Sequence, residues 1–410
     1  MTNKNSKRHR MRWSSIAAST AFFTISILVL FLQQFDFNFS TARGLVIPDV
    51  VNITNTLDTL WQTNSLFGVE NQFIAITLIY GWAWLIHPSL CFLINVALVL
   101  FAIRSFESVT KRSTSTQNWM AIGILLNPYL MLAMPGPNKE IPLLLLTTLY
   151  ASQIVNQNRW WLFKAAGLCG AIFFIRDGYG IFLLICLFLI LATRRKIELF
   201  TPAICTLLAL GSIGYGLLDS IIPAFSRNSE IYETISSQQA ATGLIASAFT
   251  LNPYEPIGGA ILFGFRLVYN IASLALFPVL STAESHVYWI GVAYWINGLL
   301  ILSLIPAIAF DTLRLKARKV PRSLIGGVVV GTWFLISLSL FVQPRYLMPI
   351  LPLALLASSE ISSRVRNIGF ALSLVFSLGV MTINATFDRK PNPQTPEQFE
   401  TPAYVWKIFN

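Results

Sequence analysis

Residues 180–192 read GIFLLICLFLILA, an apolar run that no charged residue, amide or proline interrupts, and the basic residues Arg194, Arg195 and Lys196 follow it closely. Similar runs recur along almost the whole chain, separated by short polar connectors. Hydrophobic residues occupy 55% of the 410 positions, and charged residues only 11%. Since a soluble domain carries about a quarter charged residues, the sequence predicts an all-α, polytopic integral membrane protein.

The apolar runs predict eleven membrane-spanning helices, since a crossing needs roughly 20 residues and fewer where the protein shields the helix ends. The predicted spans are Ser14–Leu32, Pro88–Ile103, Trp119–Met134, Ile141–Ile154, Trp160–Ile175, Gly180–Ala192, Leu199–Leu218, Val287–Phe310, Leu324–Phe341, Tyr346–Ser359 and Ile368–Ile383. Two more stretches, Phe73–Ile86 and Ile261–Leu280, are expected to be interfacial or re-entrant helices. Counting the second as a crossing would place the basic group 314–322 outside, which the positive-inside rule opposes.

Charge bias then orients the chain, with the N-terminus in and the C-terminus out. Residues 1–13 form a basic cytoplasmic N-terminus, ahead of an uncleaved first span. A membrane domain covers residues 14–383, with outer loops at 33–87 and 219–286, and an extracytoplasmic tail follows at 384–410. The net charge of +11 is explained by orientation, so nucleic acid is not an expected partner.

Three turns between predicted spans carry charges that are expected to lie below the membrane interface, because the flanking spans are short. These turns are 135–140, 176–180 and 343–346. Ionised groups at such depth are tolerated where they line a wet cavity or pair with each other. We therefore expect a shared cavity whose cations bind a phosphate or diphosphate, namely Lys139, Arg176, Arg345 and Arg266. The alternative is simple ion pairing of Lys139 with Glu140 and of Arg176 with Asp177, and headgroup anchoring by Arg345.

Several segments carry a family resemblance in their order along the chain. They are the long outer loop with Asp49, the stretch Phe73–Phe101, the segment from Asn127-Pro128 to Asn138-Lys139-Glu140, the run Trp160–Leu184 with Gly167, Gly170 and Arg176, and Gln343-Pro-Arg-Tyr-Leu-Met-Pro-Ile-Leu-Pro352. In these features the chain resembles the GT-C superfamily of membrane glycosyltransferases, which includes relatives that polymerise lipid-linked envelope glycans. Many members carry paired acids after the first span. Here Asp49 is followed by Val50, and Asp36, Asp58 and Glu70 lie on the same loop.

The resemblance implies sugar transfer, at the outer face of a bacterial inner membrane, from a polyprenyl phosphate or diphosphate donor. Such a reaction needs cations for the leaving phosphate and a base for the acceptor hydroxyl. Arg176 and Arg345 are expected in the first role, with Lys139 next, and Asp49 in the second. Glu140, Asp177 and Tyr346 are expected to orient them. Expected partners are the lipid bilayer, a polyprenyl-linked glycan and proteins of envelope glycan assembly.

No nucleotide motif is present, so the activated lipid-linked sugar is the expected energy source. No zinc pattern is present, whereas a divalent metal remains compatible with carboxylates and phosphates. Three alternatives stay open. An O-antigen-type polymerase would bind diphosphates through arginines without a carboxylate base; a lipid-linked glycan transporter or flippase would show paired repeats and broken helices; a noncatalytic scaffold would not need three cationic turns.

Overall fold

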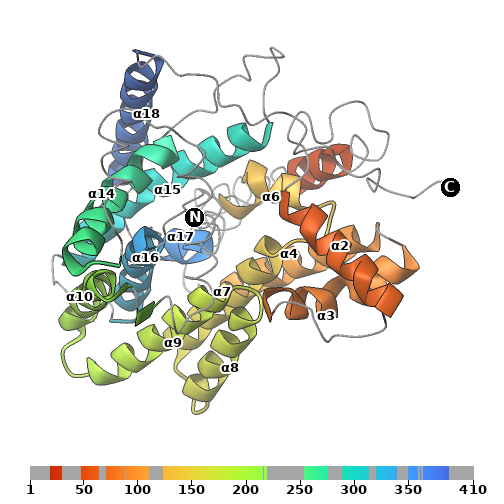
Figure 1. The fold of residues 1–410 in the computed structure, drawn as a ribbon, viewed down its shortest axis with the longest axis horizontal. Helices are drawn as coiled ribbons and strands as arrows, with labels where there is room; N and C mark the ends of the chain where they lie inside the picture. Colours follow the sequence, from red (N-terminus) through yellow and green to blue (C-terminus); the bar gives the residue numbers. More distant parts are fainter. Residues whose placement is uncertain are drawn as a thin grey trace, which may run out of the picture.

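The computed structural model describes the parts of the chain on which the account below rests. These are residues 19–29, 48–63, 71–87, 89–109, 123–215, 217–218, 254–275, 289–313, 320–338, 350–358, 361 and 363–386. Every element among them is a helix (Figure 1). In chain order the helices are α2 (Pro48–Thr63), α3 (Asn71–Ile86), α4 (Leu90–Val109), α6 (Pro128–Ala133), α7 (Glu140–Asn156), α8 (Trp161–Phe173), α9 (Asp177–Ala192), the 3-10 turn η1 (Ile197–Leu199), α10 (Phe200–Ile213), α14 (Pro256–Ala275), α15 (Trp289–Leu313), α16 (Val320–Leu338), α17 (Leu351–Ser358) and α18 (Ser363–Thr386).

Helices α7, α8 and α9 form an up-down-up unit along the lower part of Figure 1, in which α8 packs against both of its neighbours. Gln157 ends α7 in the left-handed region, with φ 41° and ψ 49°, and turns the chain toward α8. Gly180 lets α9 approach α8 closely, because a Cβ at this position would lie 2.5 Å from Cα of Phe173. The N-termini of α7 and α9 therefore face the same end of the unit.

The centre of the fold is built around the short helix α17. Its residues Leu351–Leu356 are all buried, and it packs against α7, α15 and α16. Around this centre, α14 contacts α10, α15, α16 and α18, and α4 packs along α7. Tyr150 of α7 fixes the register with α9, since its hydroxyl donates a 3.0 Å hydrogen bond to the carbonyl of Leu183.

The prediction of a polytopic membrane protein with eleven spans is corrected by the structure. Among the described residues, no helix has the combination of length and apolar character needed to cross a membrane. The predicted multi-pass topology, with its N-terminus in, its C-terminus out and its inner-membrane location, is corrected with it. The all-helical part of the prediction agrees with the described residues.

The physical reason for this error is visible where apolar runs are broken in space. Within the expected span 119–134 the chain turns at Asn127, whose side chain accepts hydrogen bonds from the backbone N–H groups of Tyr129 and Leu130, and Pro128 then begins a helix of 6 residues. Helix α8 has 13 residues and α17 has 8. In these places the apolar run overstates the length of continuous helix.

Candidate functional site

The turn between α6 and α7 is buried and rich in polar groups. Two asparagine side chains hold its carbonyl groups. Asn138 donates to the carbonyls of Ala133 and Gly136 at 2.8 and 2.9 Å, and its oxygen accepts a 2.9 Å bond from the N–H of Ile141 in the first turn of α7. Because these backbone groups lie away from water, each needs such a partner.

Asn95 ties the same turn to helices α3 and α4. Its side-chain nitrogen donates to the carbonyls of Met134 and Gly136, both at 2.8 Å, while its oxygen accepts a 2.5 Å bond from the hydroxyl of Tyr80. Burial raises the pKa of Tyr80 well above its ordinary value, and the charges of Cys91 and Glu140 act in the same direction. Tyr80 therefore stays a neutral donor, and the network fixes the turn from two other helices.

Lys139 and Glu140 lie at the start of α7 in this fixed turn. Only 6% of Lys139 and 1% of Glu140 is exposed. The ammonium nitrogen of Lys139 lies 4.1 Å from the centre of the Phe73 ring on α3. Oε2 of Glu140 accepts a 3.1 Å bond from the N–H of Lys139, whereas its buried Oε1 has no hydrogen-bond partner. A buried carboxylate oxygen without a donor is costly unless a ligand or a function uses it.

Arg176 and Asp177 occupy the corresponding position on α9. Arg176 is the residue before the first turn of that helix, and Asp177 is buried and accepts a 2.9 Å bond from the N–H of Gly178. Burial raises the pKa of the neighbouring Tyr179 above its ordinary range, and the positive charge of Arg176 acts against this rise. Two Lys/Arg–acid pairs thus lie at the same end of the α7–α9 unit, each at a helix N-terminus where the helix dipole favours negative charge.

Of the other predicted site residues, the structure describes the side chain of Arg266 alone. Arg266 on α14 is buried, and its guanidinium donates a 3.3 Å bond to the carbonyl of Leu338, the last residue of α16. Asp49 is the second residue of α2. Arg345 and Tyr346 lie outside the described residues. Among the predicted site residues, a hydrogen bond thus joins Lys139 to Glu140. The shared cavity of four cations stays a prediction.

Sequence reasoning missed the residues that build the turn, namely Phe73, Tyr80, Asn95 and Asn138 as a set. It also missed the buried bond of 2.7 Å from the Asn127 amide on the α6 side to the Asn297 oxygen on α15. One local signal was available, since an asparagine before a proline is typical of a helix start. Within the described residues, no three His, Cys, Asp or Glu side chains come together in a group that could hold a metal.

Comparisons with protein-family models, with curated proteins and with solved structures gave no match to this chain. The GT-C resemblance therefore remains a prediction.

Proposed function

We propose that the chain is a glycosyltransferase that takes a sugar from a polyprenyl phosphate or diphosphate donor, without a nucleotide. The observation that carries this proposal is the unpartnered Oε1 of Glu140, buried in a turn that also carries the buried Lys139 and is held by Asn95 and Asn138. An acid-base group fixed next to a cation supplies the two things that sugar transfer needs.

The proposed reaction assigns one role to each charged group. The acceptor hydroxyl loses its proton to a carboxylate, its oxygen forms a bond to the anomeric carbon, and the bond from that carbon to the phosphate oxygen breaks. The leaving phosphate carries the negative charge that Lys139 and Arg176 stabilise. Glu140 is the described carboxylate best suited to the role of base. Asp49, the second residue of α2, is the alternative base.

The test uses the purified full-length chain. We would measure two quantities: the binding of undecaprenyl diphosphate, and turnover, followed as the release of undecaprenyl diphosphate from its sugar-loaded forms. Glu140→Gln keeps the shape of the side chain and is expected to lower turnover by about a hundredfold or more while donor binding stays within about twofold. Lys139→Gln and Arg176→Gln are expected to weaken donor binding by about tenfold. Glu198→Gln and Arg364→Gln, which change exposed residues, serve as matched controls.

Each pattern of results has a distinct meaning. Loss of turnover in Asp49→Asn, with Glu140→Gln fully active, would move the base to Asp49. Loss in Arg176→Gln and Arg345→Gln, with both acid variants active, would indicate polymerase-type chemistry without a carboxylate base. If the purified chain binds no undecaprenyl diphosphate, or if every variant binds and turns over as the natural chain does, the proposal is wrong.

A further inference from the structure

The outward face of α8 is apolar, although it is exposed. Phe163, Gly167, Gly170 and Phe174 recur at helical spacing, and all four are exposed, with 79% of Phe163 accessible. The opposite face, with Ala165, Cys169 and Ile172, is buried against the rest of the fold. A helix that faces water on one side normally carries polar residues there. The outward face of α8 is thus unusual for a surface that meets water alone.

The neighbouring helices extend this exposed apolar surface. On α9, Leu184 and Phe188 are exposed one turn apart, and on α10, Leu207 and Leu210 are exposed. Single exposed apolar residues need no explanation, whereas a set spread over consecutive helices indicates an interaction surface. We call the exposed residues of α8, α9 and α10 named in this and the preceding paragraph the apolar face.

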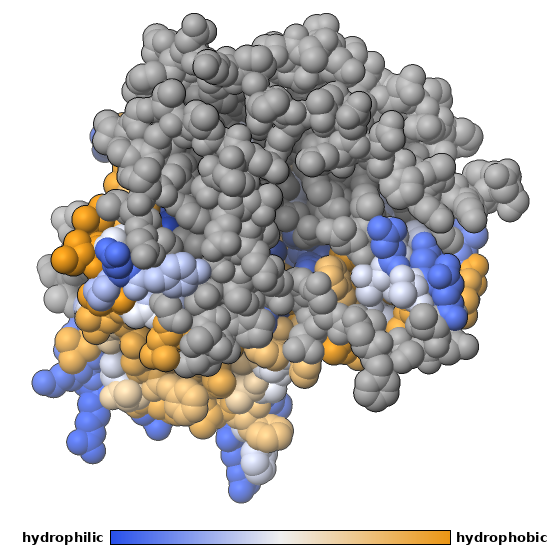
Figure 2. Space-filling view, in the orientation of Figure 1, coloured by the Kyte–Doolittle hydropathy of each residue, from blue (hydrophilic) through white to orange (hydrophobic). Residues whose placement is uncertain are grey.

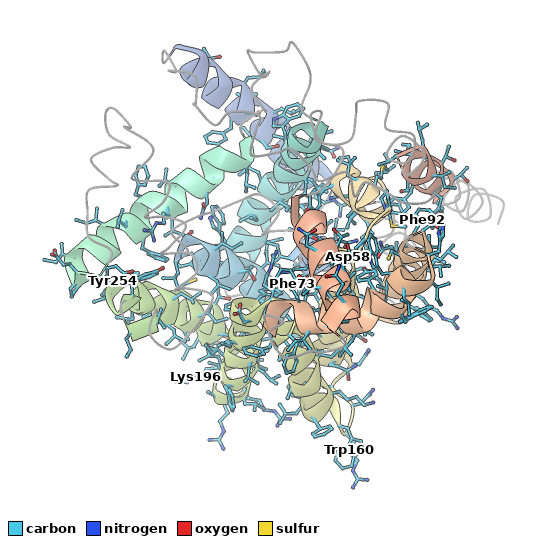
Figure 3. The ribbon with its side chains drawn as sticks, turned by 45° about the vertical axis from the view of Figure 1, so that its right-hand side comes forward. Asp58, Phe73, Phe92, Trp160, Lys196 and Tyr254 are labelled. Carbon is cyan, nitrogen blue, oxygen red and sulfur yellow. The ribbon has the colours of Figure 1, made fainter. Side chains whose placement is uncertain are left out.

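A cluster of cations borders the apolar face at the end of the α7–α9 unit away from Lys139 and Glu140. Five exposed Lys and Arg residues lie in and beside the two connections there, against one exposed acid, Glu198. They are Arg159, Lys164, Arg194, Arg195 and Lys196, which we call the basic edge. Figure 2 shows hydrophilic side chains that project beyond an apolar surface at this end of the molecule, and Figure 3 labels Trp160 and Lys196 apart from each other in the lower part of the view.

Trp160 joins the two parts of this surface. Its side chain is 62% exposed, and the guanidinium carbon of Arg159 lies 5.7 Å from the centre of its ring. An exposed tryptophan between apolar residues and cations matches the boundary of a lipid layer, where the ring lies at headgroup level and basic side chains reach the phosphates.

We propose that the apolar face and the basic edge together dock on a lipid surface that carries anionic headgroups. The apolar face contacts the acyl chains, and the basic edge binds the headgroup phosphates. Charge decides between lipid and a second copy of the chain, since a two-fold contact through this end would bring one basic edge against another, with Glu198 as the only exposed acid of the edge. The docking proposal does not rest on the proposed sugar transfer.

The test measures flotation of the full-length chain with vesicles of phosphatidylcholine, alone or mixed with phosphatidylglycerol. We expect binding that requires phosphatidylglycerol and weakens with added salt. Arg195→Gln is expected to weaken binding about fivefold, and the triple change of Arg194, Arg195 and Lys196 to Gln about a hundredfold. Arg364→Gln, which removes an exposed cation on α18, is expected to leave binding unchanged.

A separate double variant tests whether the apolar face contributes to vesicle binding. Phe163→Ser with Phe188→Ser is expected to weaken vesicle binding about tenfold, with the helical circular dichroism spectrum unchanged because both side chains are exposed. Equal binding to neutral and anionic vesicles, or no binding to either, would overturn the proposal. It would also be overturned if this variant reduced the molecular mass measured by light scattering and left vesicle binding as it was, since the face would then be an interface between copies.

Discussion

The ammonium group of Lys139 lies over the ring of Phe73, 4.1 Å from its centre, and so joins the turn before α7 to helix α3. The negative face of an aromatic ring attracts a cation, and the attraction is stronger where water is excluded. Because Lys139 is buried, the Phe73 ring helps to keep a positive charge in an interior position next to Glu140.

Phe73→Leu is expected to lower the free energy of unfolding by about 1–2 kcal/mol, since the ring face is lost from beside a buried cation. Phe73→Tyr keeps the ring and should retain most of the stability. Chemical denaturation followed by circular dichroism measures both. Phe163→Leu is the matched control, because that ring is exposed on α8 and its loss should change stability by less than about 0.5 kcal/mol. Equal effects at the two positions would argue against a stabilising role of the Phe73 ring.

Asn95→Leu is expected to cost about 3 kcal/mol of unfolding free energy. The change leaves the Tyr80 hydroxyl and the Met134 carbonyl buried without the Asn95 side chain, and it removes one of the two amide donors to the Gly136 carbonyl. Ser105→Ala on the same helix is the control, because the exposed bond that it removes runs from the Ser105 hydroxyl to the carbonyl of Phe101 one turn earlier. A cost at Asn95 as small as that at Ser105 would show that water replaces the missing bonds.

Alkaline pH is expected to destabilise the fold partly through Cys91. Burial raises the pKa of its thiol from 9.0 to about 12. Above pH 9 the unfolded chain loses this proton while the folded chain keeps it. The contribution of Cys91 to the free energy of unfolding is therefore fully present below pH 9 and is lost as the pH rises toward 12. The loss is about 1.4 kcal/mol per pH unit in that window.

Cys91→Ala should reduce the dependence of unfolding free energy on pH by about that amount, which a denaturation series above pH 9 would measure. Cys205→Ala provides a comparison, because the pKa of Cys205 rises only to about 11. The pH range over which Cys205 affects the free energy of unfolding therefore ends at a lower pH than that of Cys91. If Cys91→Ala leaves the dependence unchanged, Cys91 is already ionised in the folded state or keeps its proton in the unfolded one.

Gly180→Ala is expected to destabilise the protein by about 2 kcal/mol, since the new Cβ would lie 2.5 Å from the backbone of Phe173 and would force α8 and α9 apart. Gly170→Ala meets nothing within 4 Å and should raise stability by about 0.5–1 kcal/mol through helix propensity. Thermal unfolding of the two variants measures whether the two changes in stability have opposite signs. Similar shifts for both would mean that the two helices yield without cost.

The helical class and several helix positions could be predicted from the sequence. The run Trp160–Ile175 corresponds to α8 (Trp161–Phe173), and Gly180–Ala192 lies within α9 (Asp177–Ala192). An apolar run, however, does not say whether it lies in a lipid layer or in a protein core. The spans were wrong because no described helix combines the length and apolar character of a crossing, and at Asn127-Pro128 the helix start was visible in the sequence but was interpreted as part of a span.

The candidate site was predicted only where its residues are neighbours in the chain. Lys139 stands beside Glu140, and Arg176 beside Asp177, so charge and turn residues pointed to them. The partners that hold the first pair come from α3 and α4, and no local pattern links Asn95 to Gly136. Such a pairing is fixed by the packing of α4 along α7, which appears only in three dimensions.

The bonds from Asn95 to Met134 and Gly136 close loops of 39 and 41 positions. Forming such contacts costs loop-closure entropy before any contact energy is gained. We therefore expect them to form after the local helices. We consequently expect the turn that presents Lys139 and Glu140 to form late in folding. A nascent chain in which α4 has not yet met α7 is therefore expected to lack the finished turn that holds Lys139 and Glu140.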